Sequence, residues 1–317
     1  MEAIGGYFSL ELPLFEEYHQ DAIKLNTGRN CLEYILRCRQ YKKVYIPFYT
    51  CDVILEPFHK LGIDYAFYHI NQDFEIANDI HPQTGEAILY TNYYGLKQRY
   101  IEKLTKRYGQ QMIVDNTQAF YAKPIEGIDT FYTCRKFFGV PDGAYLYTDK
   151  LLDEELEQDV SYERMSFLLK RIDLDAETGY ADFREQSRLL IGQPIKRMSK
   201  LTERLMQSID YKKAALNRRL NFVALHEVLK YNNQYKIFLD KDAVPMAYPY
   251  LSDIKELREH LISRKIFVPR YWPNVVDGQD CNTLERRIAT HLLPLPVDQR
   301  YSFDQMNIII KIIYELC

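Results

Sequence analysis

Three segments in the first half of the 317-residue chain carry residues that suit ligand chemistry. In the first, LNTGRNCLEYIL at residues 25–36, Thr27, Gly28 and Asn30 precede a stretch with apolar residues at helical spacing. Gly28 permits a tight turn, and the next backbone N–H groups are free at a helix N-terminus, so this turn predicts a phosphate site. An ordinary helix cap is the alternative. The dinucleotide (GxGxxG) and P-loop (GxxxxGK[ST]) fingerprints are missing from the sequence.

The second segment, MIVDNTQAFY at residues 112–121, ends an apolar strand at Asp115 and places Gln118 three residues later. Ligands of α/β sheets bind beyond the carboxyl ends of the strands. A carboxylate at that position can accept a hydrogen bond from a ring nitrogen and keep the ring protonated. A simple turn cap by Asp115 is the alternative.

The third segment, DTFYTCRKFFGVPDGAYLYT at residues 129–148, contains a polar turn between two strand-like runs. Lys136 lies in that turn, with Arg135 before it and Phe137 and Phe138 after it. Desolvation among aromatic rings and a neighbouring cation both disfavour the charged ammonium. A lysine that forms a Schiff base needs its neutral amine, which makes Lys136 the candidate nucleophile. A solvated surface lysine is the alternative.

The order of these segments resembles the DegT/DnrJ/StrS sugar-aminotransferase family of fold-type I pyridoxal-phosphate (PLP) enzymes, over nearly the whole chain. The segments that carry the resemblance are IGGYFSLEL, LNTGRN, IPFYTCDVILEP, DNTQA, TCRKFFGVPDGAYL and LPLPVDQRY. Among them, the DxxQA and (S/T)xRK…PDG elements are the most specific. They match a compact branch of the family with a shortened loop before the lysine.

The resemblance implies a role for each matching residue. Lys136 matches the lysine that forms the internal aldimine, Asp115 the carboxylate that pairs with the pyridine nitrogen, and Gln118 the residue near the phenolic oxygen. The other implied cofactor contacts are Gly28, Arg29 and Asn30 in the phosphate turn, Thr133 at the phosphate, Tyr49 and Cys51 near the ring-stacking position, and Asn92 at a strand end. Separately, Arg270 in VPRYWP offers a guanidinium fork for a substrate carboxylate, with a solvated arginine as the alternative.

The function implied by the resemblance is amino transfer with PLP as cofactor. An amino donor, glutamate in much of the family, would give its amino group to a keto group, with a nucleotide-linked sugar as one candidate acceptor. Another PLP reaction, dehydration or a lyase step, is the enzymatic alternative, although relatives that dehydrate sugars replace the lysine with histidine. A binding or regulatory protein that kept the fold and lost turnover is the non-enzymatic alternative. The family also implies a homodimer with its active site near the interface.

Composition narrows the remaining classes of partner and compartment. A net charge of −3 gives no positive field for nucleic acid, and no apolar stretch reaches the roughly 18 residues of a membrane span. The six cysteines form no CxxC pair and the histidines lie at no zinc-like spacing, so we expect free thiols and no metal site. The first 20 residues do not read as a signal peptide, so the expected location is cytoplasmic.

The predicted architecture is an α/β fold of the fold-type I PLP-transferase class. A large PLP-binding domain (1–210) with a mostly parallel sheet flanked by helices is expected to precede a small α+β domain (211–317). Expected strands are 44–47, 64–70, 87–92, 112–115, 130–133 and 144–148, then 246–251 and 266–272. Expected helices are 31–41, 97–109, 154–172, 183–209, 213–231, 252–264 and 303–316, the last two with Ser252 and Ser302 as N-caps.

Overall fold

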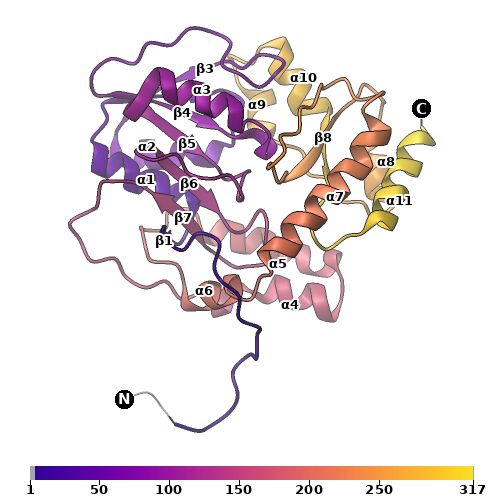
Figure 1. The fold of residues 1–317 in the computed structure, drawn as a ribbon, viewed down its shortest axis with the longest axis horizontal. Helices are drawn as coiled ribbons and strands as arrows, with labels where there is room; N and C mark the ends of the chain where they lie inside the picture. Colours follow the sequence, from indigo (N-terminus) through magenta and orange to yellow (C-terminus); the bar gives the residue numbers. More distant parts are fainter. Residues whose placement is uncertain (1–3, 317) are drawn as a thin grey trace.

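The computed structural model of the protein describes residues 4–316. A seven-stranded sheet in the order β1-β7-β6-β5-β4-β2-β3 forms the centre of the first half of the chain (Figure 1). Its strands are β1 (Ile23–Leu25), β2 (Lys43–Pro47), β3 (Asp64–Tyr68), β4 (Glu86–Thr91), β5 (Met112–Asp115), β6 (Asp129–Thr133) and β7 (Ala144–Tyr147). Strands β2 to β6 pair in parallel, whereas β7 is antiparallel to both β6 and β1. The mostly parallel sheet predicted from sequence is confirmed.

The two faces of the sheet are buried by different helices, as the alternation of side chains along β4 shows. Ala87 and Leu89 belong to one apolar core, whereas Ile88 and Tyr90 belong to the other. Helices α1 (Gly28–Arg39) and α2 (Glu56–Leu61) contribute buried residues to the first core, and α3 (Gln98–Tyr108) contributes to the second. Strands buried on both faces read as nearly continuous apolar runs, which is why the sequence revealed them.

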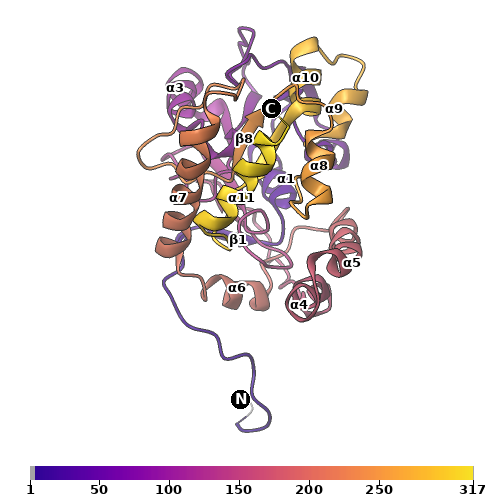
Figure 2. The same cartoon turned by 90° about the vertical axis from the view of Figure 1, so that its right-hand side faces the viewer.

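Four helices connect the two halves of the chain: α4 (Ser166–Asp173), α5 (Ala176–Leu189), α6 (Lys200–Met206) and α7 (Tyr211–Leu229). The α4 and α5 helices pack against each other as a hairpin below the sheet domain (Figure 2). Of the predicted segment 154–172, only its C-terminal part is α-helical, and Gly192 and Pro194 lie in the non-helical stretch that interrupts 183–209. Proline cannot continue a helix interior, which explains why the predicted helix 183–209 is interrupted.

The C-terminal part contains a two-stranded antiparallel sheet, formed by β8 (Ala247–Leu251) and β9 (Leu292–Pro296). Its helices are α8 (Leu257–Ser263), α9 (Pro273–Asp277), α10 (Thr283–His291) and α11 (Phe303–Tyr314). Helix α11 packs against both α7 and α8 (Figure 2). One apolar core runs from the second face of the large sheet into this part. The division at residues 210 and 211 therefore stays a prediction.

Two local predictions in this part are wrong. Residues 266–272 form no strand, and Ser252 does not cap α8, whose N-cap position is Glu256. The hydroxyl of Ser252 instead accepts the N–H of Ile254 at 3.2 Å, which makes a local turn. Ser302, in contrast, forms the predicted cap of α11 as part of a capping box.

Candidate active site

The carboxyl ends of the parallel strands meet at one edge of the sheet, where a cavity of about 450 Å³ opens. In register, Thr91 at the end of β4 lies beside Asp115 at the end of β5. Both residues line the cavity, as does Thr133 at the end of β6. This is the edge at which α/β sheets bind ligands.

Lys136 and Asp115 reach this cavity and are connected through Thr117. The Nζ of Lys136 donates a hydrogen bond to the Thr117 hydroxyl at 3.0 Å. The backbone N–H of Thr117 donates to Oδ1 of Asp115 at 2.8 Å, and the Thr91 hydroxyl donates to Oδ2 at 3.3 Å. Asp115 is buried, whereas Lys136 is exposed toward the cavity. The structure thus brings an amine and an oriented carboxylate into one cavity.

The aromatic residues after Lys136 anchor its turn but do not enclose its amine. Phe137 and Phe138 are buried in the apolar core. The carbonyl of Phe137 accepts hydrogen bonds from the buried guanidinium of Arg218 at 3.1 Å and from Gln299 at 2.9 Å. The C-terminal part of the chain therefore fixes the position of the turn that carries the lysine.

The turn that follows requires glycine at position 143. Gly143 has φ +105°, and a Cβ there would lie 2.8 Å from Thr202 and 3.0 Å from the sulfur of Cys134. Cys134 is fully buried, and burial raises the pKa of its thiol. The glycine of the PDG element is therefore required by the backbone conformation of this turn, and Cys134 is a thiol packed in the core.

The predicted phosphate turn opens α1. The Thr27 side chain caps the helix by accepting the N–H of Asn30 at 3.2 Å, and the N–H groups of the first turn have no intrahelical partner. A Cβ on Gly28 would lie 3.3 Å from Cγ2 of Thr117 and 3.9 Å from Cβ of Thr133. Glycine thus leaves open the space between the helix N-terminus and the hydroxyls of the cavity.

Seven of the predicted site residues line the same cavity: Gly28, Arg29, Cys51, Asp115, Gln118, Thr133 and Lys136. Gln118 accepts the N–H of Tyr94 through Oε1 at 2.8 Å, which leaves its amide NH2 group for other partners. The guanidinium of Arg29 forms an ion pair with Glu56. Burial raises the pKa of the Cys51 thiol.

Four predicted site residues lie outside the cavity lining: Asn30, Tyr49, Asn92 and Arg270. Asn30 is buried and donates to the carbonyl of Gln193 at 2.9 Å, and Asn92 is buried and donates to Asn116 at 3.0 Å. Tyr49 is buried, and its ring lies 4.7 Å from that of Trp272, between centroids. Arg270 is exposed. Contacts of these four side chains with a ligand stay predictions.

Several lining residues were not singled out from the sequence, among them Thr117, Arg135, Tyr271 and Trp272, together with Phe183, Ser187 and Leu190 on or beside α5. Thr117 lies in the DNTQ segment, between Asp115 and Gln118. The α5 contacts depend on the hairpin folding back over the sheet edge, which no local pattern reveals.

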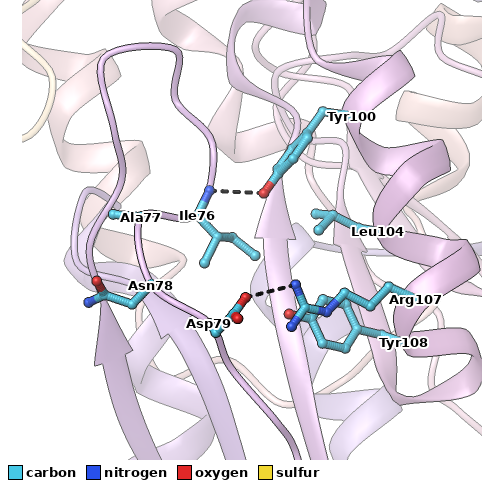
Figure 3. A pocket seen from close by; sticks show the side chains of 8 residues that line it. All are labelled: Ile76, Ala77, Asn78, Asp79, Tyr100, Leu104, Arg107 and Tyr108. Atoms are coloured by element: carbon cyan, nitrogen blue, oxygen red, sulfur yellow. Dashed lines mark hydrogen bonds and ion pairs between the residues drawn. The ribbon is translucent and has the colours of Figure 1, made fainter.

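A second hollow, of about 400 Å³, lies beside α3 (Figure 3). Two pairs of its lining residues contact each other: Arg107 contacts Asp79 at 3.1 Å, and the Tyr100 hydroxyl accepts the N–H of Ile76 at 3.1 Å. In residues 4–316, no cluster of three His, Cys, Asp or Glu side chains could hold a metal ion. No helix in that range is long and apolar enough to cross a membrane. The Lys136 cavity is therefore the candidate site.

The chain matches no protein-family model, and a search of curated proteins finds no significant relative. Solved structures do match. A DegT DnrJ EryC1 StrS aminotransferase from Brucella abortus aligns with a TM-score of 0.60 and 15% identity, over 93% of this chain and 85% of that one. PseC of Helicobacter pylori, an aminotransferase of pseudoaminic acid biosynthesis, aligns at 0.65 and 14%, over 93% and 86%.

The chain has the fold of these aminotransferases. A GDP-4-keto-6-deoxymannose-3-dehydratase solved with a trapped PLP-glutamate geminal diamine has the same fold, with a TM-score of 0.61 and 15% identity over 92% of this chain and 87% of that one. The fold-type I architecture predicted from sequence is thus confirmed, and the fold itself admits more than one reaction.

Proposed function

We propose that this protein is a PLP-dependent aminotransferase that transfers an amino group from glutamate to a keto group of a nucleotide-linked sugar. The observation that carries the proposal is the meeting of Lys136, Asp115 and the N-terminus of α1 in one cavity. Solved proteins with this fold include sugar aminotransferases and a sugar dehydratase trapped with a PLP-glutamate adduct.

The residues of the cavity fit the proposed cofactor. Its phosphate requires hydrogen-bond donors and positive charge, which the first turn of α1, Thr133 and Arg29 supply. Its pyridine nitrogen requires a carboxylate, and Asp115 is the only acidic residue among those that line the cavity. A volume of about 450 Å³ lies in the range of small-molecule sites.

When bound, PLP supplies an aldehyde that combines with amines and a ring that withdraws electrons. Lys136 is the amine placed to bind that aldehyde and then to carry a proton to and from the reacting carbon. Asp115 would hold a proton on the ring nitrogen, and the Thr91 hydroxyl and the Thr117 N–H fix the orientation of its carboxylate. The Thr117 hydroxyl holds the free lysine amine beside the site.

A different PLP reaction is the second candidate, because a sugar dehydratase shares the fold. The presence of lysine at position 136 favours amino transfer, since the resemblance assigns histidine to the dehydrating branch. A regulatory protein without turnover is the third candidate. The amine and the oriented carboxylate of the cavity favour an enzyme over this reading.

We also propose that the protein is a homodimer with the site near the interface. The α4–α5 hairpin, which contributes Phe183 and Ser187 to the cavity, carries exposed large apolar side chains. These are Leu169, Ile172, Tyr180, Phe183 and Leu189, with Leu174 between the helices. A second copy that covered them would bury apolar surface beside the site. A fully active monomer in light scattering would contradict this proposal.

The proposed compartment is the cytoplasm. The five described cysteines are free, and thiols persist in a reducing compartment. Cys317 lies outside the described residues.

The test of the proposed function is the visible absorbance of the purified protein with added PLP, before and after glutamate. We expect a Schiff-base band that disappears with glutamate as 2-oxoglutarate forms, and no such band in Lys136→Ala. A band that glutamate cannot change would favour the regulatory reading, and no band in either protein would leave only the fold in common.

A further inference from the structure

Arg135 is a half-buried cation of the cavity that lacks a partner of opposite charge. It lines the cavity beside Lys136, and its Nε is buried without a hydrogen-bond partner. Among residues 4–316, no carboxylate lies within ion-pair distance of its guanidinium. A partly desolvated charge is stabilised when an opposite charge lies beside it, so the position favours an anionic ligand.

The neighbouring charges strengthen this requirement. Arg29 and Arg164 lie near Arg135, and each of them already has an acidic partner: Glu56 for Arg29, and Asp159 at 2.6 Å for Arg164. Burial is the largest cause that lowers the pKa of Arg135, to about 10, and the charge of Arg29 is the next. At neutral pH the guanidinium is still charged, and the two neighbouring arginines are already paired with their own carboxylates.

The carboxylate that acts electrostatically on Arg135, that of Asp142, is committed to other groups. Asp142 accepts the N–H of Ser199 at 3.1 Å and its hydroxyl at 2.9 Å, and it also accepts the hydroxyl of Thr202. These bonds fix Asp142 to the start of α6. It contributes to the field at Arg135 but leaves the guanidinium without a direct contact.

The guanidinium of Arg135 is held in place by α5. Its Nη2 donates to Gln186 and, at 3.1 Å, to the Ser187 hydroxyl, and its Cζ lies 5.8 Å from the ring centre of Phe183. Gln186 in turn donates to the carbonyl of Pro141, in the turn after Lys136. An arginine held in this way is organised before a ligand binds, which lowers the entropic cost of binding.

We propose that Arg135 binds the phosphate group of the ligand in this cavity, together with the N-terminus of α1. The inference rests on the proposed function and adds a residue that the phosphate turn and Thr133 did not include. Arginine offers a fork of donors that matches phosphate oxygens, and a phosphate dianion would supply the opposite charge that this guanidinium lacks.

The test compares PLP with pyridoxal, which has the same ring and aldehyde but no phosphate. Trp272 is the only tryptophan of the chain and lines the cavity, so its fluorescence reports binding without any turnover. We expect Arg135→Met to weaken PLP binding about ten- to a hundredfold while pyridoxal binding changes less than about twofold. Arg135→Lys keeps the charge without the fork, so its PLP affinity should lie between those of Arg135→Met and wild type. Arg184→Met, at an exposed position of α5, is the matched control and should bind PLP and pyridoxal like wild type.

Three results would overturn the inference. These are unchanged PLP affinity in Arg135→Met, an equal loss for PLP and pyridoxal, or a loss confined to the glutamate half-reaction, which would place Arg135 at the substrate carboxylate. If Arg135→Met does not fold, the same comparison of PLP with pyridoxal in Arg135→Lys tests the inference.

Failure of the proposed function has a different signature. If wild type binds neither PLP nor pyridoxal, inorganic phosphate tests the anion site by itself. Thermal stabilisation of wild type but not of the Arg135 variants would support a phosphate site for another ligand, and no stabilisation of wild type would contradict it.

Discussion

Lys136 and Asp115 are connected through one residue, Thr117, whose hydroxyl accepts the lysine amine at 3.0 Å and whose N–H donates to the carboxylate at 2.8 Å. The two groups come from different strand ends, β6 and β5, which pair in parallel at the edge of the sheet. The distance between amine and carboxylate is thus set by the short DNT turn and by strand register.

Thr117→Val removes the hydroxyl and preserves the size of the side chain. Because the lysine then loses its oriented contact, we expect the rate constant of the glutamate half-reaction to fall about tenfold, with the N–H bond to Asp115 kept. Stopped-flow absorbance measures the rate. Thr117→Ser, which restores the hydroxyl, should recover most of it, and equal losses in the Val and Ser variants would contradict the role given to the hydroxyl.

Asp115→Asn keeps an oxygen that can accept the N–H of Thr117 but removes the negative charge. An amide cannot hold a proton on the ring nitrogen, so we expect the half-reaction to slow by at least about a hundredfold. The free energy of unfolding in urea should change by no more than about 1 kcal/mol, because the hydrogen bonds remain possible. A variant with the wild-type rate would show that Asp115 has no role in the chemistry.

Gly28→Ala fills the space between the start of α1 and the cavity. The added Cβ would lie 3.3 Å from Cγ2 of Thr117, so we expect PLP affinity to fall about tenfold in a Trp272 fluorescence titration. Helix propensity favours alanine over glycine, so the ligand-free protein should lose no stability. A loss of stability together with affinity would indicate a packing defect in place of a blocked phosphate site.

The stability of the protein should fall with acid because of His19. This side chain is buried against Phe120, whose carbonyl it contacts at 2.8 Å, and burial lowers its pKa to about 4. Between pH 6.5 and 4 the unfolded chain binds a proton at this site that the folded chain does not. The contribution of His19, up to about 3 kcal/mol, is therefore present above pH 6.5 and is lost as the pH falls toward 4.

Urea unfolding of wild type and His19→Gln at pH 7 and pH 5 measures this effect. The difference in unfolding free energy between the two pH values should be smaller in the variant, by about 2 kcal/mol. Equal differences in the two proteins would contradict the buried neutral histidine.

The sequence revealed most of the large sheet, because its strands are short apolar runs between amphipathic helices. It failed at residues 266–272, which have strand-like composition but find no partner, and at β9, whose Pro294 and Pro296 disguise a strand of a two-stranded sheet. Whether each of these two segments forms a strand depends on pairing with a distant segment, which local composition does not show.

The site shows the same division. Lys136, Asp115 and Gly28 lie in local motifs that the sequence displays, and the fold brings them together. The role proposed for Arg135 depends on its contact with Gln186 of α5, about 50 residues later in the chain, which no local pattern predicts. Tyr49 and Asn92 were chosen by position in a motif, yet their side chains are buried away from the cavity lining.

The most direct test of the central claim is chemical trapping of the lysine. Wild-type protein incubated with PLP, reduced with borohydride and digested should yield one pyridoxyl-modified peptide, with the added mass on Lys136. In Lys136→Arg, the same treatment should leave every peptide unmodified. Modification at another lysine, or none in a protein that binds PLP, would contradict the assignment of Lys136 as the residue that holds the cofactor.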